Sequence, residues 1–394
     1  MAEILEKFQE PKEGELAGTR KWKRAASGYE LFMQEEGIPI FRGIGVRDVR
    51  ELTLGAWKRM GGRGIFLCLD GLEGAKGMYV VEVPSAGMLN PERHTYDEFF
   101  YVVEGRGSTE IWREGSSKKQ IFEWQAGSLF TAPINTWHRL VNASSSPALL
   151  LVANNAPPIM DTFRNREFVF ENSYEFTDRY DDSEDFFKAK DDLIPHPGNL
   201  RAVRRTNLIP DIVNCELPLD NQRSPGYRRI EPGWSGYGVE HTGFISEHRS
   251  GRYSKAHYHR SGAVLVCLKG KGYTFNWPRE YGTHPWESGN GAAVRRQEYI
   301  PGGLVAAAPG GGDWFHQHFG IGKEPLRILN FWGGPRPQIR EGKAGDEITS
   351  GNLNIEQGGH SVDYRVEDPY VRKTFKEALA KEGVEFTMPE SVYG

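Results

Sequence analysis

The chain has 394 residues, and its 49 Lys and Arg against 53 Asp and Glu give a formal net charge of −4 at pH 7. Such a balance provides no general basic field for nucleic acid or an anionic membrane, and no apolar run approaches the roughly 18 residues of a membrane helix. The 47 glycines and 23 prolines favour turns and β structure over long helices. We therefore expect about two β-rich domains that bind neither nucleic acid nor a membrane.

Cysteine usage and the N-terminus bear on the compartment. Cys68, Cys215 and Cys267 lie far apart, which argues against a disulfide framework. The first residues alternate charges where a signal peptide has an apolar core. Both features predict a cytoplasmic protein.

The texture of the sequence changes four times along the chain. Residues 1–50 are typical of a helical and then irregular extension. Short β-branched and aromatic runs between glycines fill residues 51–155, a pattern that predicts an all-β sandwich or barrel. An acidic and then proline-rich connector occupies residues 156–227, and strand texture returns over 228–335. The remainder, 336–394, forms a tail.

One well-marked helix is predicted in this tail, over residues 368–382. Asp368 can cap it, Pro369 suits the first helical position, and Gly383 can end it. Apolar residues recur on one side at Val371, Phe375 and Leu379. A helix of this length is marginal alone in water, so the stripe must be buried on a barrel of the same chain or on another subunit. Together with the need to cover open sheet edges, this predicts a homo-oligomer.

The two β regions are copies of one another. Residues 95–105 align with residues 260–270 at a constant offset of 165. Histidines before and after these stretches match as well, His94 with His259 and, at an offset of 178, His138 with His316. The sequence therefore indicates a tandem duplication of one β unit.

Two His-x-His pairs mark the second copy, His257 with His259 and His316 with His318. Residues i and i+2 of a strand point to the same face, so each pair presents two imidazoles to one side. Imidazole suits Fe, Zn, Cu, Ni and Mn, and three or four of them on converging strands would make a strong metal site. The alternative is that the histidines are surface residues or satisfied core residues.

The first copy offers a different set. His94 is followed four residues on by Glu98, and His138 stands in the matching later position. Two histidines and one carboxylate are the ligand types of the facial triad at non-haem iron. Glu92 lies two residues before His94 and adds an acid on the same strand face. A polar patch or a decayed site is the alternative.

These residues resemble the cupin superfamily, whose first motif is G-x5-H-x-H-x3/4-E-x6-G and whose second is G-x5-P-x-G-x2-H-x3-N. In the first copy His94, Glu98 and Gly105 fit, but Glu92 stands where the first histidine is expected. The second motif of that copy is nearly complete, with Asn135 in the place of glycine.

The second copy departs from the pattern elsewhere. His257 and His259 fit the first motif, whereas Ala263 replaces the glutamate. Its second motif has Gly311 in place and His316 two residues late. Over about residues 51–155 and 228–335, the chain resembles a bicupin.

The resemblance implies an all-β fold of two tandem cupin jelly-roll barrels with helical N- and C-terminal extensions. It implies a second-barrel metal site of His257, His259 and His316, the three-histidine pattern of cupin dioxygenases of the gentisate, β-diketone and thiol type. Three neutral ligands leave the metal its full charge and open positions, which favours a bidentate substrate anion together with O2. His318 is a catalytic candidate, either as a fourth ligand or as a donor beside the site.

The implied first site consists of His94, Glu98 and His138 and would hold a second metal less tightly. Glu92 is the other catalytic candidate, as a ligand, a general base, or the partner of a nearby arginine such as Arg93 or Arg139. The sequence leaves these three roles open.

The leading hypothesis for function is an Fe(II)-dependent dioxygenase that acts on a small organic acid, phenol or enolisable carbonyl compound; Mn(II), Zn(II), Ni(II) and Cu(II) also suit the ligands. A lyase or decarboxylase of the oxalate-decarboxylase kind wants the full His-x-His…Glu…His set, which neither copy has. A cupin isomerase stays open. A non-catalytic metal- or ligand-binding bicupin is disfavoured, because the candidate ligands are retained. Fold alone does not decide among these chemistries.

Overall fold

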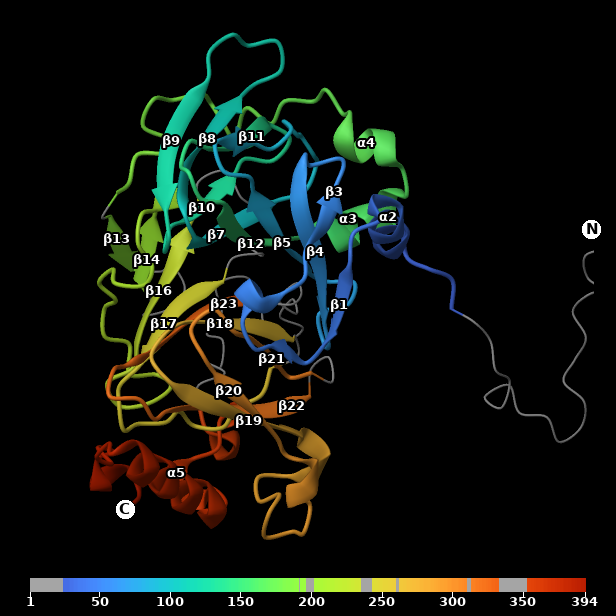
Figure 1. Cartoon of the computed structure of the whole chain (residues 1–394). Coiled ribbons are helices and arrows are strands. Elements are labelled where there is room, and N and C mark those ends of the chain that lie inside the picture. Colours follow the sequence, from blue (N-terminus) through green and yellow to red (C-terminus); the bar gives the residue numbers. More distant parts are fainter. Residues whose placement is uncertain are drawn as a thin grey trace, which may run out of the picture.

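The computed structural model describes residues 24–190, 192–195, 202–234, 243–259, 262–309, 313–332 and 353–394. Two β-barrels follow one another along this part of the chain, with short helices beside the first and a longer helix below the second (Figure 1). Arg260, Ser261 and Gly311, quoted above for the repeat and the motifs, lie outside the described residues, as do residues 1–23 of the N-terminal extension. The predicted all-β fold of two jelly-roll barrels is confirmed.

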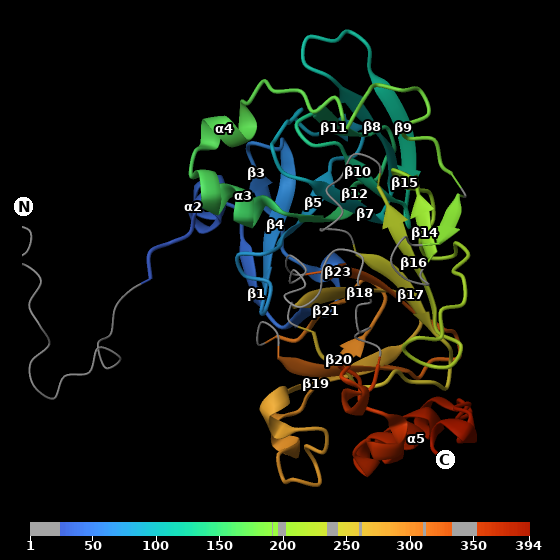
Figure 2. The same cartoon turned by 180° about the vertical axis from the view of Figure 1, so that it is seen from behind.

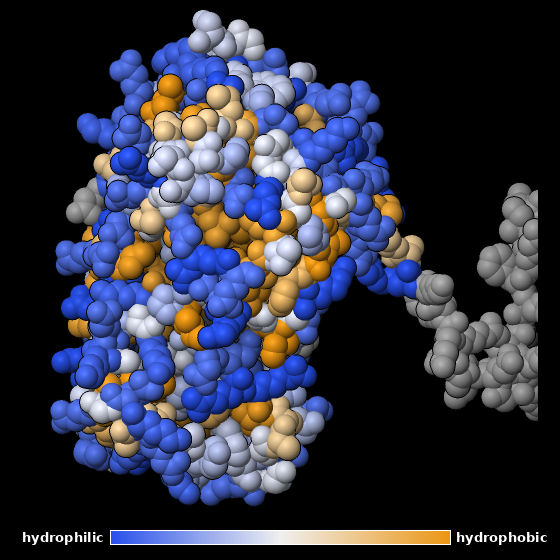
Figure 3. All heavy atoms as spheres, viewed as in Figure 1, coloured by the Kyte–Doolittle hydropathy of each residue, from blue (hydrophilic) through white to orange (hydrophobic). Residues whose placement is uncertain are grey.

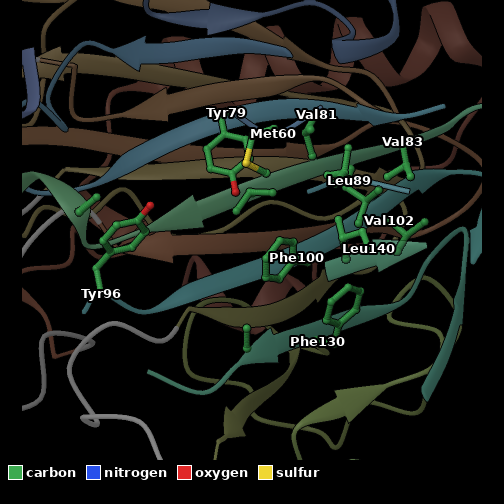
Figure 4. Packing of buried hydrophobic residues seen from close by; sticks show 14 of the residues in the cluster. Met60, Tyr79, Val81, Val83, Leu89, Tyr96, Phe100, Val102, Phe130 and Leu140 are labelled. Atoms are coloured by element: carbon green, nitrogen blue, oxygen red, sulfur yellow. The ribbon is translucent and has the colours of Figure 1, made fainter. Parts of the chain in front are cut away.

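The first barrel consists of a large and a small sheet. The large sheet has the order β1 (Ile40–Gly43), β4 (Gly62–Leu69), β5 (Gly77–Val83), β12 (Ala148–Asn154), β7 (Glu98–Glu104), β10 (Leu129–Ala132) and β15 (Leu208–Ile209), and β3 (Gly55–Trp57) pairs with β4. The small sheet has the order β6 (Gly87–Met88), β11 (Trp137–Asn142), β8 (Arg106–Trp112) and β9 (Gln120–Gln125). Figure 4 shows side chains of different strands, among them Tyr79, Val81, Phe100 and Phe130, gathered in one core.

The second barrel repeats this design. Its large sheet has the order β13 (Leu193–Pro195), β14 (Ala202–Arg205), β16 (Arg228–Gly233), β17 (Phe244–His248), β23 (Leu326–Trp332), β18 (Ala263–Lys269), β21 (Leu304–Ala307) and β2 (Gly45–Val46). Its small sheet has the order β20 (Arg295–Tyr299), β19 (Gly272–Pro278) and β22 (Trp314–Gly320). The turns between the paired strands also match: Gly105 and Gly270 both have positive φ, 88° and 83°. A Cβ at Gly270 would lie 2.4 Å from the Pro325 carbonyl oxygen, so only glycine fits there.

The two barrels share strands and a core. β2 lies in sequence between β1 and β3 of the first barrel but pairs with β21 of the second, and β15 of the connector pairs with β10 of the first. One apolar cluster contains residues from both large sheets, for example Leu67, Val80 and Leu151 with Val264 and Leu329. The large sheets therefore bury one face against each other, while the surface seen in Figure 3 is mainly hydrophilic.

Three helices lie beside the first barrel, α2 (Gly28–Glu36), α3 (Ala156–Phe163) and α4 (Arg166–Phe170), as both views show (Figures 1 and 2). Ser27 and Glu30 form a capping box at the start of α2, and Gly37 ends it with a φ of 68°. Single 3-10 turns occur at η2 (Val49–Glu51), η4 (Arg279–Tyr281), η5 (Gly291–Ala293), η6 (Ile355–Gln357), η7 (Tyr364–Val366) and η8 (Glu390–Val392). No helix within the described ranges is long and apolar enough to cross a membrane. All three cysteines are free.

The tail helix α5 (Pro369–Glu382) has the predicted limits. The Asp368 side chain accepts a hydrogen bond from the Tyr370 backbone N–H, and Gly383 closes the helix in the left-handed region. The ring of Phe375 is 5.0 Å from that of Tyr253 and 5.6 Å from that of Phe319 in the second barrel. The apolar stripe is therefore buried within its own chain and gives no further reason for a partner subunit. The homo-oligomer stays a prediction.

A carboxyl group beneath this tail makes the stability of the chain depend on pH. Burial raises the pKa of Glu367 to about 7, against the hydrogen bonds from Tyr253 and Gln317. Between pH 4.5 and 7 the folded state therefore binds more protons than the unfolded chain, and stability falls as pH rises through this window. We expect Glu367→Gln to become more stable than the wild type from pH 5 to pH 8, by about 1–3 kcal/mol at the upper end.

Urea unfolding at a series of pH values measures this difference. Glu377→Gln, at an exposed position of α5, is the matched control and should show no comparable trend. A constant difference between Glu367→Gln and the wild type across pH 5–8 would contradict the prediction.

Candidate metal centres

Three histidines of the second barrel form the first candidate centre. His257 and His316 face each other across a two-way backbone bridge, with N···O distances of 3.0 and 2.9 Å. The ring of His316 lies 4.1 Å from that of His257 and 4.6 Å from that of His259. Ligand nitrogens of all three lie within 4.8 Å of one another. The structure thus brings together the three histidines that the sequence singled out.

The surroundings prepare these imidazoles to bind a metal. Nδ1 of His257 is 3.1 Å from the Lys255 carbonyl oxygen, which assigns the proton to Nδ1 and leaves a lone pair on Nε2. Burial, followed by the positive charge of Arg223, lowers the pKa of His257 well below its ordinary value. Burial together with neighbouring imidazoles does the same for the pKa of His316. Neutral imidazole is the form that binds a metal.

His318 lies on the same strand face but outside this group of ligand atoms. Its ring is 5.5 Å from that of His316, and its Nδ1 lies 2.8 Å from the Tyr299 hydroxyl. The side chain is buried, with 8% of the residue exposed. His318 therefore lies beside the three-histidine cluster and not within it.

Four residues of the first barrel form the second candidate centre: Glu92, His94, Glu98 and His138, whose ligand atoms also lie within 4.8 Å of one another. Glu92 and His138 face each other through two backbone hydrogen bonds of 2.9 Å, just as His257 and His316 do. Glu92 therefore occupies the place of His257, as the motif comparison indicated.

The donor atoms of this first-barrel cluster lie close to one another. Backbone carbonyls fix the rings, with Nδ1 of His94 2.8 Å from the Tyr96 oxygen and Nδ1 of His138 3.1 Å from the Thr136 oxygen. Nε2 of His138 is buried, has no hydrogen-bond partner among the described residues, and lies 3.6 and 3.9 Å from carboxylate oxygens of Glu92 and Glu98. An orphaned imidazole nitrogen between two carboxylates fits a divalent cation.

Two hydrogen-bond donors orient the carboxylate of Glu98. Its Oε1 accepts hydrogen bonds from the Tyr79 hydroxyl at 3.0 Å and from the Asn154 amide at 3.1 Å. Its Oε2 is thereby directed to the cluster, 3.2 Å from Nε2 of His94. Hydrogen-bonded supports of this kind fix the direction of a ligating carboxylate. Neither Tyr79 nor Asn154 belongs to the motifs, so no sequence signal pointed to them.

Glu92 has an arginine partner, but it is neither of the two that the sequence suggested. Arg93 pairs with Glu114, and the Arg139 guanidinium lies 2.8 Å from Glu110. The guanidinium that contacts Glu92 belongs to Arg59. Burial opposes the charged carboxylate, yet Arg59 and His138 together hold the pKa of Glu92 well below its usual range.

Arg59 in turn is part of a closed network with the flanking helices. It lies 2.8 Å from Glu36 of α2, which is 2.9 Å from Arg166 of α4. Its guanidinium also lies over the rings of Phe32 and Phe170, at 5.6 and 5.2 Å. The helices beside the barrel are thus connected to the first cluster through one arginine.

The two centres differ in charge. The first-barrel centre contains two carboxylates, whereas the second-barrel centre has three neutral imidazoles because Ala263 begins β18 where Glu98 begins β7. Anionic ligands lower the effective charge of a bound metal, and neutral ligands preserve it. A metal bound in the second barrel would therefore keep a higher effective charge than one bound in the first.

A hollow of about 280 Å³ lies elsewhere, between α2 and the large sheet of the first barrel. Tyr29, Cys68 and Lys76 are among its lining residues, and none of its lining residues belongs to either cluster. We therefore assign the chemistry to the clusters and not to this hollow.

Residues 79–154 match the family model of the cupin domain. No curated protein matches the chain. A solved structure of an oxalate decarboxylase variant from Bacillus subtilis is similar with a TM-score of 0.45 and 12% identity, over 75% of this chain and 78% of its own.

A further structure of oxalate decarboxylase gives a TM-score of 0.46 and 13% identity, over 74% of this chain and 78% of its own. The Bacillus subtilis enzyme has Mn(II) centres. At this level of similarity, the chemistry of these enzymes does not transfer to this chain.

Proposed function

We propose that this chain, which folds as two tandem cupin jelly-roll barrels, is a metal-dependent enzyme whose reaction takes place in the second barrel. The proposed substrate is a small organic acid, phenol or enolisable carbonyl compound, and the proposed reaction is its oxygenation by O2. The observation that carries the proposal is the three-histidine cluster, with its nitrogens within 4.8 Å of one another and no carboxylate among them.

The chain's own residues account for binding and orientation. His257, His259 and His316 would hold the ion, which when bound supplies Lewis acidity and open coordination positions. Since the three imidazoles are neutral, the compensating negative charge has to come from the substrate, which favours an enolate, phenolate or carboxylate. Burial of His257 and His316, which are 5% and 2% exposed, keeps bulk water from these ligands.

We propose Fe(II) as the metal for oxygenation. Mn(II), Zn(II), Ni(II) and Cu(II) also accept imidazole ligands, so the residues support a divalent metal more firmly than a particular one.

A lyase or decarboxylase reaction is the second candidate, and Glu92 favours it. This carboxylate lies 3.6 Å from His138 within the first cluster and is kept ionised by Arg59. A fixed, charged carboxylate beside a metal centre can orient a substrate for a reaction that needs no O2. In this alternative the first barrel is the catalytic one.

Simultaneous measurement of O2 uptake and CO2 release separates the two candidates. Metal-loaded protein is offered catechols, gentisate-like acids, β-diketones and oxalate. O2 consumption in proportion to the substrate consumed supports the dioxygenase, and CO2 release without O2 uptake supports the lyase. Turnover of none of these classes by protein with full metal occupancy would overturn the proposed enzymatic function in favour of a metal- or ligand-binding protein.

Single ligand variants assign the reaction to a barrel. We expect His257→Ala to lower turnover by more than about 100-fold, because it removes a metal ligand. Removing a residue that only hydrogen-bonds to a ligand already costs about 10–100-fold. His94→Ala should have a clearly smaller effect, because it changes the first barrel only. Initial rates with metal content measured in parallel provide the test. A total loss in His94→Ala with the second-barrel metal retained would move the active site to the first barrel.

A further inference from the structure

The second barrel has polar side chains at inward positions where the first barrel has apolar ones. Asn276 lies opposite His316 across the β19–β22 pair, and Ile111 lies opposite His138 across the β8–β11 pair. His316 and His138 are equivalent members of the two clusters, so Asn276 takes the place of Ile111. Directly opposite residues of an antiparallel pair point to the same face. Asn276 therefore points to the same side of the sheet as His316.

Two histidines follow the same rule. His318 stands two residues beyond His316, where the first barrel has Leu140 two residues beyond His138. His248 ends β17 and Val83 ends β5, and each pairs with the first residue of the neighbouring strand, β23 or β12. The rings of His248 and His318 are 5.6 Å apart. The polar side chains thus continue from the three-histidine cluster to His248.

Several polar atoms at these positions are buried without a protein partner. Asn276 is 0% exposed, and among the described residues neither its Oδ1 nor its Nδ2 has a hydrogen-bond partner. Nδ1 of His248, a residue that is 2% exposed, lacks one in the same part of the structure. A buried polar group without a hydrogen bond destabilises the folded protein. The second barrel has these polar groups at positions where the first barrel has the apolar side chains of Ile111 and Val83. This difference indicates a ligand that forms hydrogen bonds with them.

The charge of the region favours an anion. The Arg223 carbonyl accepts hydrogen bonds from the Lys255 N–H at 3.0 Å and from the Tyr364 hydroxyl at 3.3 Å, which places Arg223 beside the segment that leads to His257. After burial itself, the positive charge of Arg223 contributes to the lowered pKa of His248. A cation, an amide and neutral imidazoles together provide donors for a carboxylate.

We propose that Asn276, His318 and His248, together with the positive charge of Arg223, form a carboxylate-binding pocket beside the three-histidine cluster. The substrate is then a small acid that carries a carboxylate in addition to the group held at the metal. This inference rests on the proposed function and narrows its substrate class. The first barrel, with apolar side chains at the three equivalent positions, lacks this selectivity.

Matched pairs of small molecules test the pocket by binding alone. 3,4-Dihydroxybenzoate and catechol share one metal-binding diol and differ in a carboxylate; malate and lactate share one hydroxy-acid group and differ in a second carboxylate. Isothermal titration calorimetry on metal-loaded and on metal-free protein gives the dissociation constants. In each pair we expect the wild type to bind the molecule with the additional carboxylate at least about tenfold more tightly, as a desolvated charge-assisted hydrogen bond provides.

The first barrel supplies variants that its own fold already accepts. Asn276→Ile and His318→Leu introduce the residues of the equivalent positions, and Arg223→Gln removes the charge without altering the inward positions. Asn276→Ile and Arg223→Gln should each reduce the preference to within about twofold while the affinity for catechol stays the same. His284→Leu changes a partly exposed histidine outside both clusters and should keep the preference.

The outcomes separate the pocket from the proposed function. An equal preference in the wild type, or one unchanged in Asn276→Ile and Arg223→Gln, overturns the pocket even where metal content is full. Failure of the second barrel to bind metal overturns the proposed function, whereas the carboxylate preference of metal-free protein still decides the pocket. Loss of preference in the folded variants, with metal content retained, supports it.

Discussion

Replacing His257 and His259 together with alanine is expected to remove most of the metal bound by the second barrel while the fold stays intact. Two of three ligands are lost, and His316 alone cannot retain the ion. The imidazoles do not stabilise the fold through a positive charge, because burial keeps the pKa values of His257 and His316 low and the rings neutral. Inductively coupled plasma mass spectrometry of protein purified without added metal gives the metal content per chain, and circular dichroism checks the fold.

A matched variant guards this result against an indirect effect. His284 is a partly exposed histidine of the second barrel that belongs to neither cluster, so His284→Ala should retain the wild-type metal content. Retention of the full metal complement by the double variant would show that the three-histidine cluster is not a metal site.

Replacing Arg59 with methionine is expected to destabilise the metal-free protein by about 3–5 kcal/mol. The guanidinium contacts both Glu36 and Glu92, whose side chains are only 3% and 10% exposed. Removing it leaves the buried Glu92 without its guanidinium partner and Glu36 with Arg166 alone, and the loss of this compensation outweighs the gain from the apolar replacement. Methionine keeps much of the aliphatic contact with Phe32 and Phe170, so the effect reports mainly on charge. Urea unfolding measures it.

Arg63→Met is the control for this change. Arg63 pairs with Glu82 at 3.4 Å, but its side chain is 54% exposed, and an exposed pair contributes only about 0–1 kcal/mol. If Arg59→Met costs no more than Arg63→Met, the network around Glu92 does not stabilise the first barrel as the structure indicates.

The sequence predicted the architecture because the two copies repeat the same residues at the same spacing. His94 with His259 and His138 with His316 occupy equivalent places in the two barrels. The tail helix was predictable for a local reason, since Asp368 and Gly383 mark its ends by their own backbone chemistry. Its packing on the second barrel was left open because a helical stripe does not specify its partner.

The remaining features of the sites depend on contacts between distant segments. Arg59 lies 33 residues before Glu92 in the sequence but contacts it in the fold. Nearness in sequence had suggested Arg93 or Arg139 instead. β2 pairs with the second barrel although its neighbours in sequence belong to the first. β15 pairs with the first barrel although it lies in the connector. Asn276 and His248 belong to no motif, and only the strand register shows that they replace Ile111 and Val83.

Anomalous diffraction at the absorption edge of the bound metal tests the central claim most directly. Crystals of the full chain, loaded with Fe(II) under anaerobic conditions, should show an anomalous peak bounded by His257, His259 and His316. Ligand distances of about 2.0–2.3 Å are expected for imidazole nitrogens on such an ion. A peak in this position supports a metal-dependent enzyme centred on the second barrel. A crystal with measured metal content and no peak between these three histidines would contradict it.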